Sequence, residues 1–213
     1  MLKLSEIYLS IQGESTFTGL PCIFIRLSGC NLRCKYCDTK YSYETKFEKS
    51  SKDILKEIQQ YKLIKLVEIT GGEPLIQSEI YELFLILYDN NYKILLETNG
   101  TINLKKVPKY VTKIVDIKCP GSGFENSFLM ENLKHISLQE DEIKFVILDR
   151  QDYDWAKVFI KKHDLQKYII LFSPILEKLE PQKLAKWITN DKLQVRMQLQ
   201  MHKYIWKSDQ RRV

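Results

Sequence analysis

Short apolar runs rich in β-branched residues alternate along the chain with segments whose apolar residues recur at helical spacing. The short runs predict strands at 21–27, 66–70, 92–98, 113–117, 142–148, 168–172 and 193–199. The helical patterns lie at 51–61, 78–89, 126–133, 152–163 and 181–188. Ser51 and Asp152 are predicted N-caps, and Pro181 suits a first helical turn. Strand and helix therefore alternate over most of the chain.

This alternation predicts an α/β fold with a parallel sheet and covering helices. Several strands read as continuous apolar runs, which is typical of a sheet buried on both faces. About six βα units fall short of an eightfold barrel, so we expect an open, partial (β/α) barrel. No linker interrupts the pattern, which predicts a single domain over residues 1–213.

Composition and charge narrow the class of protein. Of the 213 residues, 44% are hydrophobic and 28% charged, as in a soluble globular protein. No apolar stretch approaches the ~20 residues that span a bilayer, and Glu6 interrupts the start where a signal peptide would be apolar. The net charge of +6 is spread along the chain, with one short cluster at Arg211 and Arg212. We expect neither a membrane nor a nucleic acid as partner.

Five cysteines, odd in number and partly clustered, favour a reducing cytoplasmic location over a disulfide framework. Cys30, Cys34 and Cys37 have the spacing C-x3-C-x2-C, which supplies three thiolates and no fourth. Structural zinc sites and ferredoxin clusters take four ligands. The loop therefore favours an iron–sulfur cubane with one iron open to a small molecule. Two alternatives stay open: a zinc site completed by a distant Cys or His, and unrelated buried thiols.

Further motifs follow the predicted strands directly. The segments are the cysteine loop, 70–74 (Thr-Gly-Gly-Glu-Pro), 97–100 (Glu-Thr-Asn-Gly), 116–118 (Asp-Ile-Lys) and 172–174 (Phe-Ser-Pro). Parallel (β/α) sheets gather ligands at the carboxyl edge of their strands. The two glycines let a ligand approach bare backbone, and Glu73 could face a cationic group. We expect these loops to meet at one site.

Three more polar features have competing interpretations. The turn Gln12-Gly13-Glu14 is either a solvated loop or part of a binding site. Arg26 lies within an apolar strand, where a charge needs a partner. It could form a structural ion pair with Glu14 or bind a substrate carboxylate as a guanidinium fork. Thr39 could close an Asx turn begun by Asp38 or offer a hydroxyl to Mg²⁺.

Together these motifs resemble the radical S-adenosylmethionine (SAM) superfamily, and within it the 7-carboxy-7-deazaguanine synthase family. The resemblance rests on segments 10–15, 24–39, 70–74, 97–101, 116–120 and 200–204, so it runs over nearly the whole chain. It implies a homodimeric lyase of queuosine and 7-deazapurine biosynthesis. That enzyme would convert 6-carboxy-5,6,7,8-tetrahydropterin into 7-carboxy-7-deazaguanine with loss of ammonia. Its partners would be this small pterin and an electron donor such as flavodoxin or ferredoxin.

The resemblance also implies the site residues and cofactors, which are a 4Fe-4S cluster, SAM and Mg²⁺. No side chain is expected to be catalytic, because the cluster and SAM generate the radical. The implied metal ligands are Cys30, Cys34 and Cys37 for the cluster and Thr39 for Mg²⁺. The implied SAM contacts are Tyr36, Asp38, Gly72, Glu73, Asn99, Asp116, Lys118 and Ser173. The implied substrate contacts are Ile11, Gln12, Gly13, Glu14, Arg26 and Thr70.

The chain departs from the family pattern at two places. Ser15 stands where relatives often have glycine, and residues follow Tyr204 where a relative may end. Cys22, Cys119 and His202 are interpreted as structural or near-site residues. The alternative enzyme is a glycyl-radical-enzyme activase of the same superfamily. The non-enzymatic alternative is a metal-binding or electron-transfer module, which should have a fourth cysteine.

Overall fold

The computed structural model describes residues 1–206 and is built on one nine-stranded sheet. The strands are β1 (Leu2–Ile11), β2 (Pro21–Leu27), β3 (Phe47–Lys49), β4 (Leu66–Gly71), β5 (Lys93–Thr98), β6 (Val111–Asp116), β7 (Glu142–Ile147), β8 (Ile169–Pro174) and β9 (Arg196–Met197). Arg211, Arg212 and most of the segment after Tyr204 lie outside the described residues.

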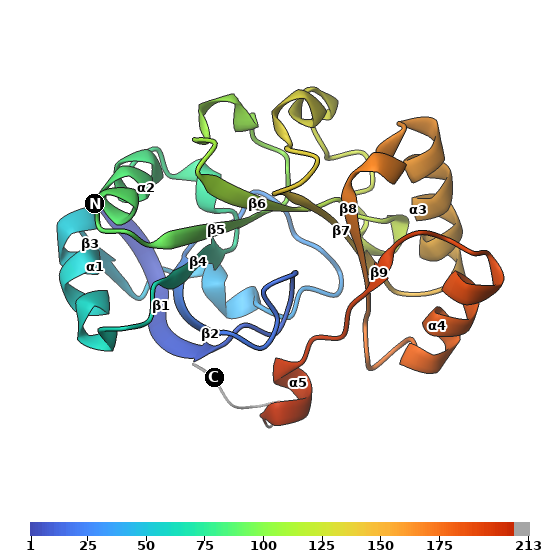
Figure 1. Ribbon diagram of the computed structural model, residues 1–213, viewed down its shortest axis with the longest axis horizontal. Coiled ribbons are helices and arrows are strands. Elements are labelled where there is room, and N and C mark those ends of the chain that lie inside the picture. The colour runs from blue at the N-terminus through green and yellow to red at the C-terminus, as the bar shows by residue number, and fades with distance from the viewer. Residues whose placement is uncertain (207–213) are drawn as a thin grey trace.

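The sheet is an open, strongly curved partial barrel, as the sequence predicted. Its strand order is β3-β1-β2-β4-β5-β6-β7-β8-β9. β1 runs antiparallel to β2 and β3, whereas every neighbouring pair from β2 to β9 is parallel. Figure 1 shows the sheet curving from β1 and β2 at one end to β8 and β9 at the other. Six connections join the parallel neighbours, in line with the expected six or so units, but only four contain an α-helix. The two that flank β6 contain only 3-10 segments.

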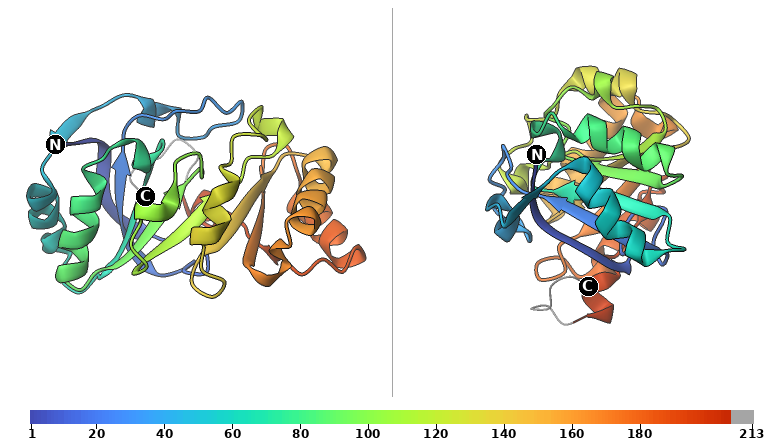
Figure 2. Two further views of the ribbon diagram at one scale, coloured as in Figure 1. Left: turned by 90° about the horizontal axis from the view of Figure 1, so that it is seen from above. Right: turned by 90° about the vertical axis from the view of Figure 1, so that its left-hand side faces the viewer.

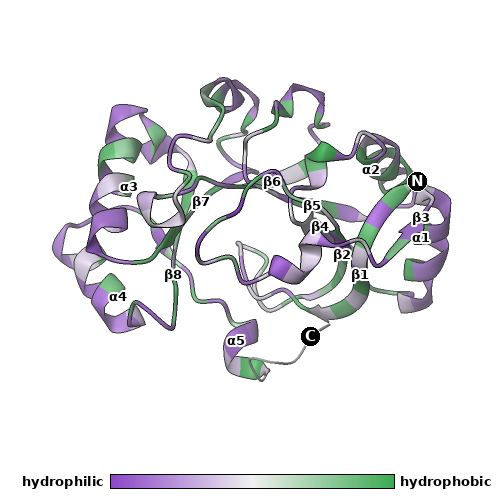
Figure 3. Ribbon diagram, turned by 180° about the vertical axis from the view of Figure 1, so that it is seen from behind, coloured by the Kyte–Doolittle hydropathy of each residue, from purple (hydrophilic) through white to green (hydrophobic). Residues whose placement is uncertain are grey.

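Four longer helices cover the outer side of the sheet: α1 (Ser51–Ile58), α2 (Ile80–Asp89), α3 (Arg150–Lys162) and α4 (Pro181–Asn190). Figure 2 shows α1 and α2 at one end and α3 and α4 at the other. In Figure 3 these helices change along their length between hydrophilic and hydrophobic residues, as helices with one buried face do. Within residues 1–206, no helix combines the length and apolar character needed to cross a membrane.

The predicted caps were wrong by a few residues. Ser50 caps α1, because its side chain accepts a hydrogen bond from the Asp53 amide. Asp149 caps α3 by accepting from the Asp152 amide. The Asp152 carboxylate instead accepts from the amides of Gly121 and Leu148, which ties α3 to the loop after β6. Pro181 does begin α4, as expected.

Other boundaries also differ from the sequence prediction. The predicted helix 126–133 is a 3-10 segment, Met130–His135, because the Asn132 side chain bonds to the neighbouring loop. It accepts from the Leu104 amide and donates to the carbonyls of Gly100 and Ile102. β1 and β3 were not predicted, and the predicted strand 193–199 is reduced to two residues.

The two faces of the sheet differ, which corrects the expectation of strands that are apolar on both faces. Outward residues such as Ile69, Leu96 and Phe145 join the helices in the main hydrophobic core. Alternate residues on the inner face are buried and polar. They include Glu68, Thr70, Asp116, Glu142, Lys144 and Ser173. Buried polar side chains need partners, so the inner face is where a binding site can be built.

The end of the described chain crosses the open side of the barrel. Gln198, directly after the edge strand β9, donates its backbone N–H to the carbonyl of Phe172 on β8. Met201 then donates to the carbonyl of Gly13, in the loop between β1 and β2, at 2.9 Å. The short helix α5 (His202–Ile205) follows and lies at the open side in Figure 1. The inner face is therefore bordered by sheet, loop and carboxyl-terminal segment together.

Candidate active site

The three cysteines lie on one loop that follows β2. All three are free and partly buried. The loop is held by hydrogen bonds from the Cys37 amide to the Cys34 carbonyl (3.3 Å) and from the Lys35 amide to Ser122 (3.1 Å). The thiols are close enough to influence one another's ionisation. The sequence prediction that they act as a group therefore has a structural basis.

These thiols fit a cluster better than a single metal ion. Within residues 1–206, no three His, Cys, Asp or Glu side chains are placed to hold one metal ion. In an iron–sulfur cubane, by contrast, each cysteine binds a different iron. Burial raises the pKa of the Cys30 and Cys34 thiols, and Lys118 opposes this rise. Metal charge would deprotonate such thiols, as coordination generally does.

The Gly71-Gly72-Glu73 turn packs directly beneath the cysteine loop. Gly72 donates to Leu27 at 3.3 Å, and Glu73 donates to the Gly29 carbonyl at 2.9 Å. A Cβ atom on Gly72 would overlap the Gly29 carbonyl and come within 2.7 Å of the Cys30 Cβ. The glycine is therefore required for contact between the two loops. This contact alone explains why residue 72 is glycine, without the expectation that Gly72 leaves room for a ligand.

Gly72→Ala should accordingly disturb the cysteine loop itself. We expect the free energy of unfolding to fall by about 1–3 kcal/mol from overpacking, together with a reduced iron content after reconstitution. Urea unfolding and iron analysis measure the two effects. Gly19→Ala is the control for backbone strain without a clash, because its φ is +96° and a Cβ there meets no atom within 4 Å. It should lose some stability but keep a normal iron content. Normal iron content in Gly72→Ala would contradict the packing argument.

Glu73 is buried and joins the glycine turn to the loop after β5. Its carboxylate accepts from Thr98 Oγ1 (2.8 Å), the Asn99 amide (2.7 Å) and the Leu75 amide (3.1 Å). Burial raises the pKa of Glu73 to about 6, although these hydrogen bonds partly offset the effect. The carboxylate thus has a structural role, and its contact with SAM stays a prediction.

Three predicted cofactor residues carry buried polar atoms without a hydrogen-bond partner in the described part of the chain. They are Tyr36 Oη, Asp116 Oδ1 and Ser173 Oγ. They come from three separate segments, the cysteine loop, the end of β6 and the end of β8. Burial and then the Asp116 carboxylate raise the pKa of Tyr36. Because unpartnered buried polar atoms are costly, these atoms fit a bound ligand with complementary polar groups.

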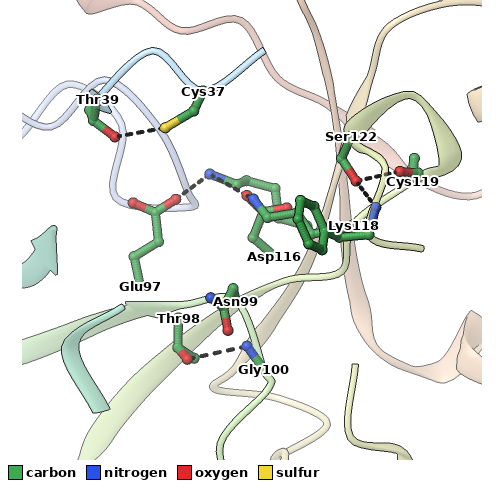
Figure 4. A network of polar contacts seen from close by, with 12 residues as sticks. Cys37, Thr39, Glu97, Thr98, Asn99, Gly100, Asp116, Lys118, Cys119 and Ser122 are labelled. Atoms are coloured by element: carbon green, nitrogen blue, oxygen red, sulfur yellow. Dashed lines mark hydrogen bonds and ion pairs between the residues drawn. The ribbon is translucent and has the colours of Figure 1, made fainter. Parts of the chain in front are cut away.

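Lys118 and Asn99 complete this side of the site, as Figure 4 shows. Lys118 pairs with Asp116 Oδ2 at 2.7 Å and opposes the burial that raises the pKa of the Cys34 thiol. Asn99 donates to Asn31 Oδ1 in the cysteine loop at 3.1 Å. Asp38 differs, because it is exposed and pairs with Lys203 of α5 at 3.5 Å. Thr39 lies beside Cys37, with 3.7 Å between its hydroxyl and the sulfur.

The Gln12-Gly13-Glu14 turn lies on the inner side of the barrel, so the solvated-loop interpretation was wrong. Gln12 is buried, its amide oxygen accepts from the Glu14 amide at 3.0 Å, and its amide nitrogen donates to Glu68. Gly13 packs against His202, where a Cβ would overlap the imidazole. In this arrangement Gln12 positions Glu14, since its amide oxygen holds the Glu14 backbone and its amide nitrogen is anchored on Glu68. The contact between Ile11 and a substrate stays a prediction.

Ser15 adopts a left-handed conformation with φ +66°. Glycine takes that conformation without strain, which gives a physical reason for the glycine that the resemblance leads us to expect here. Two hydrogen bonds hold the serine: its amide donates to Gln198 at 2.6 Å, and its hydroxyl accepts from Phe17 at 3.1 Å. The loop therefore keeps a glycine-like path despite the substitution.

Arg26 points to the inner face but has a different partner from the one considered. Its Nε pairs with Glu6 at 2.8 Å, and a terminal nitrogen donates to the Tyr8 hydroxyl at 3.1 Å. Tyr41 also donates to Glu6, at 3.0 Å. The proposed ion pair with Glu14 was wrong, because Glu6 lies opposite Arg26 in the β1–β2 register.

Glu14 instead pairs with Lys144 of β7, a residue that the sequence prediction missed. Lys144 Nζ lies 2.9 Å from Glu14 Oε2, contacts Glu97 Oε1, and is 3.9 Å from Asp116 Oδ2. Glu97 also accepts from Thr70 at 3.0 Å. The sequence did contain a signal for Lys144, because it is a lysine within an apolar strand. The same kind of signal singled out Arg26.

Glu68 is a buried carboxyl behind the turn. Burial, and then repulsion from Glu97, raise the pKa of Glu68 from 4.5 to about 8. The folded protein therefore keeps a proton here that the unfolded chain loses above pH 4.5. This contribution to stability is complete below pH 4.5 and is lost as the pH rises towards 8.

Glu68→Gln should remove this pH dependence, since glutamine resembles the protonated acid and can still accept from Gln12. The stability advantage of the wild-type protein over the variant should shrink by about 1.4 kcal/mol per pH unit between pH 5 and 8. Urea unfolding of both proteins at several pH values measures this difference. A constant difference would mean that Glu68 is ionised in the folded protein throughout.

Comparison with known proteins adds three findings. A model of the radical SAM superfamily matches residues 24–119, which include the cysteine loop, the glycine turn and Asp116. A 7-carboxy-7-deazaguanine synthase from Koribacter versatilis is 45% identical over 96% of this chain and 97% of its own length. The synthase of that name from Chlorobaculum tepidum is 44% identical over 100% of this chain and 97% of its own length.

A solved structure extends the similarity to three dimensions. The crystal structure of QueE from Escherichia coli superimposes with a TM-score of 0.75 and 27% sequence identity. The match covers 92% of this chain and 93% of that protein. The similarity thus extends over most of both chains.

Proposed function

We propose, since the chain belongs to the 7-carboxy-7-deazaguanine synthase family of radical SAM enzymes, that it converts 6-carboxy-5,6,7,8-tetrahydropterin into 7-carboxy-7-deazaguanine with loss of ammonia. The product would enter queuosine or another 7-deazapurine pathway. The observation that carries the proposal is the meeting of the cysteine loop, the orphaned polar atoms and the Glu14 turn on one inner face. Sequence identity of 45% and 44% over nearly the full length of two synthases of that name supports the choice of reaction.

The residues present fit the two cofactors of this superfamily. Cys30, Cys34 and Cys37 would hold a 4Fe-4S cluster, leaving one iron for SAM. Tyr36, Asp116 and Ser173 have the unpartnered atoms that SAM could satisfy, with Asp38, Gly72, Glu73, Asn99 and Lys118 as further predicted neighbours. When bound, the cluster and SAM supply a carbon radical that can remove a hydrogen atom from the substrate. The protein's contribution is to bind, orient and exclude water.

The opposite side of the inner face would hold the substrate. Glu14 and Glu97 offer carboxylates to the N–H donors on the edge of the pterin ring. The substrate carboxylate would lie at the Arg26 side, away from these acidic groups. Thr70 stands between the two regions and already contacts Glu97. Ile11, Gln12 and Gly13 would form the wall of the pocket that holds Glu14 in place.

Five further features belong to the same proposal. Thr39 would give one oxygen ligand to Mg²⁺, whose other ligands would be substrate and water. The enzyme would act as a homodimer in the cytoplasm and receive electrons from a flavodoxin or ferredoxin. Residues 1–213 would form one radical SAM domain.

Anaerobic turnover tests the function. The reconstituted protein is incubated with SAM, a reductant and the carboxytetrahydropterin, and the product mass is recorded. We expect 7-carboxy-7-deazaguanine. SAM cleavage without this product would refute the substrate but retain the superfamily chemistry. The comparisons do not favour the glycyl-radical-enzyme activase, because relatives spanning nearly the whole chain have the synthase name.

A further inference from the structure

Lys144 is the cation at the centre of the polar inner face. It lies on β7 with 5% of its side chain exposed, whereas 19% of Glu14 and 28% of Glu97 are exposed. Its ammonium contacts both carboxylates and lies 3.9 Å from Asp116. Lys144 therefore stands behind the carboxylates, which face the open interior. It joins a loop near the start of the chain to three neighbouring strands.

The ion pairs around Lys144 are held from several sides. Glu14 also accepts from Gln198 (3.2 Å) and Gln200 (2.8 Å), both in the carboxyl-terminal segment. Glu97 accepts from Thr70. Glu14 thus has two neutral donors and Glu97 has one, and the two carboxylates share the ammonium. The ammonium is the only group in the described contacts that bonds to both of them.

We propose that Lys144 is a positioning residue that sets the spacing and charge of Glu14 and Glu97, so that the pair recognises the N–H-rich edge of the substrate ring. This inference rests on the proposed function and identifies which buried group makes the pocket selective. Lys144 acts through the two carboxylates. The substrate meets their exposed oxygens.

The chemical reason is that two neighbouring, partly buried carboxylates repel one another unless a cation lies between them. An aminopyrimidinone edge presents several N–H donors and needs ionised acceptors to match them. Burial disfavours the charged form of Glu14, but Lys144 and His202 outweigh it and lower the pKa of Glu14. Glu14, Glu97 and Asp116 in turn outweigh burial and raise the pKa of Lys144.

Loss of the cation should therefore make substrate affinity depend on pH. Without Lys144, one carboxyl of the pair would take up a proton near neutral pH and lose an acceptor. Raising the pH would restore it. The other titratable or charged groups that face this pair are Glu68, Asp116, Lys118, Glu142 and His202. All of these groups are also present in the wild-type protein. The ratio of the substrate affinities of variant and wild type at each pH therefore isolates the effect of removing Lys144.

The test compares Lys144→Gln with Lys113→Gln. Lys113 is a buried lysine on the adjacent strand β6 and pairs with Asp141 at 2.8 Å. It belongs to no part of the pocket, so its replacement reproduces the loss of a buried ion pair alone. Anaerobic calorimetry would measure the dissociation constant of the carboxytetrahydropterin for each reconstituted, SAM-loaded protein from pH 6.5 to 9.

For Lys144→Gln we expect at least 30-fold weaker substrate binding at pH 7, shrinking several-fold towards pH 9, with SAM affinity unchanged. Lys113→Gln should lose stability but bind the substrate like the wild type. Equal affinities of Lys144→Gln and wild type, or a loss that is independent of pH, would overturn the proposal. No substrate binding by the wild-type protein would refute the proposed function instead.

Lys144→Arg keeps the inference testable if the glutamine variant fails to fold. Arginine retains the charge but separates the carboxylates differently. We expect a folded protein whose substrate affinity is about tenfold lower than that of the wild type. This reduction should be the same at every pH. Wild-type affinity in this variant would show that any buried cation suffices and that spacing has no role.

Discussion

Replacing Cys34 by alanine should yield a folded protein that cannot hold its iron–sulfur cluster and has no detectable turnover. The reason is that only three thiols lie on the loop and each is needed for a different iron. The side chain is partly buried and makes no bond within the main core, so the fold should survive. Iron analysis and the visible absorption of the reconstituted protein measure the outcome.

Cys22→Ala is the matched control for this experiment. Cys22 is buried beside Tyr8 and Phe24 on the inner side of β2, away from the cysteine loop. Its replacement should leave iron content and colour unchanged. Full iron content in Cys34→Ala, or loss of iron in Cys22→Ala, would require a different set of ligands.

Replacing Arg26 by glutamine should weaken binding of the carboxytetrahydropterin roughly ten- to a hundredfold while SAM binding is retained. A charge-assisted hydrogen bond of this kind contributes about 1.5–3 kcal/mol. The structure adds a second effect, because Arg26 pairs with the buried carboxylate of Glu6. Leaving that carboxylate unpaired should lower the free energy of unfolding by about 3–5 kcal/mol.

The double variant Arg26→Gln with Glu6→Gln separates the two effects. Its amides can keep hydrogen bonds to Tyr8 and Tyr41 without an unpaired buried charge. We expect most of the stability to return while substrate binding stays weak in calorimetry. If substrate affinity also returned, Arg26 would be a structural partner of Glu6, and another group would have to bind the substrate carboxylate.

Lys144 and Arg26 divide the inner face into regions of different charge. Arg26 with Glu6 lies on β2 and β1, whereas Lys144 joins Glu14, Glu97 and Asp116 on the other side of Thr70. A substrate with an anionic carboxylate and a ring edge rich in N–H donors is complementary to this division. The two sets of variants should therefore impair recognition of opposite ends of one molecule.

The sequence by itself determined most of the strand–helix alternation from β2 onward, the open α/β barrel, the cysteine loop and the family. These features depend on residues that are contiguous or periodic, so their pattern survives without coordinates. The sequence prediction fails where hydrogen bonds of a single side chain override the local helical pattern. Asn132 holds a 3-10 segment where a helix was expected, and Ser50 replaces Ser51 as the cap.

The tertiary structure alone decided which charged groups meet. Strand register placed Glu6 beside Arg26, and the path of the first loop placed Glu14 beside Lys144, 130 residues further along the chain. It also showed that Gly72 is a glycine because two loops touch there. Such pairings depend on long-range register and loop paths, and a buried charge signals only that some partner must exist.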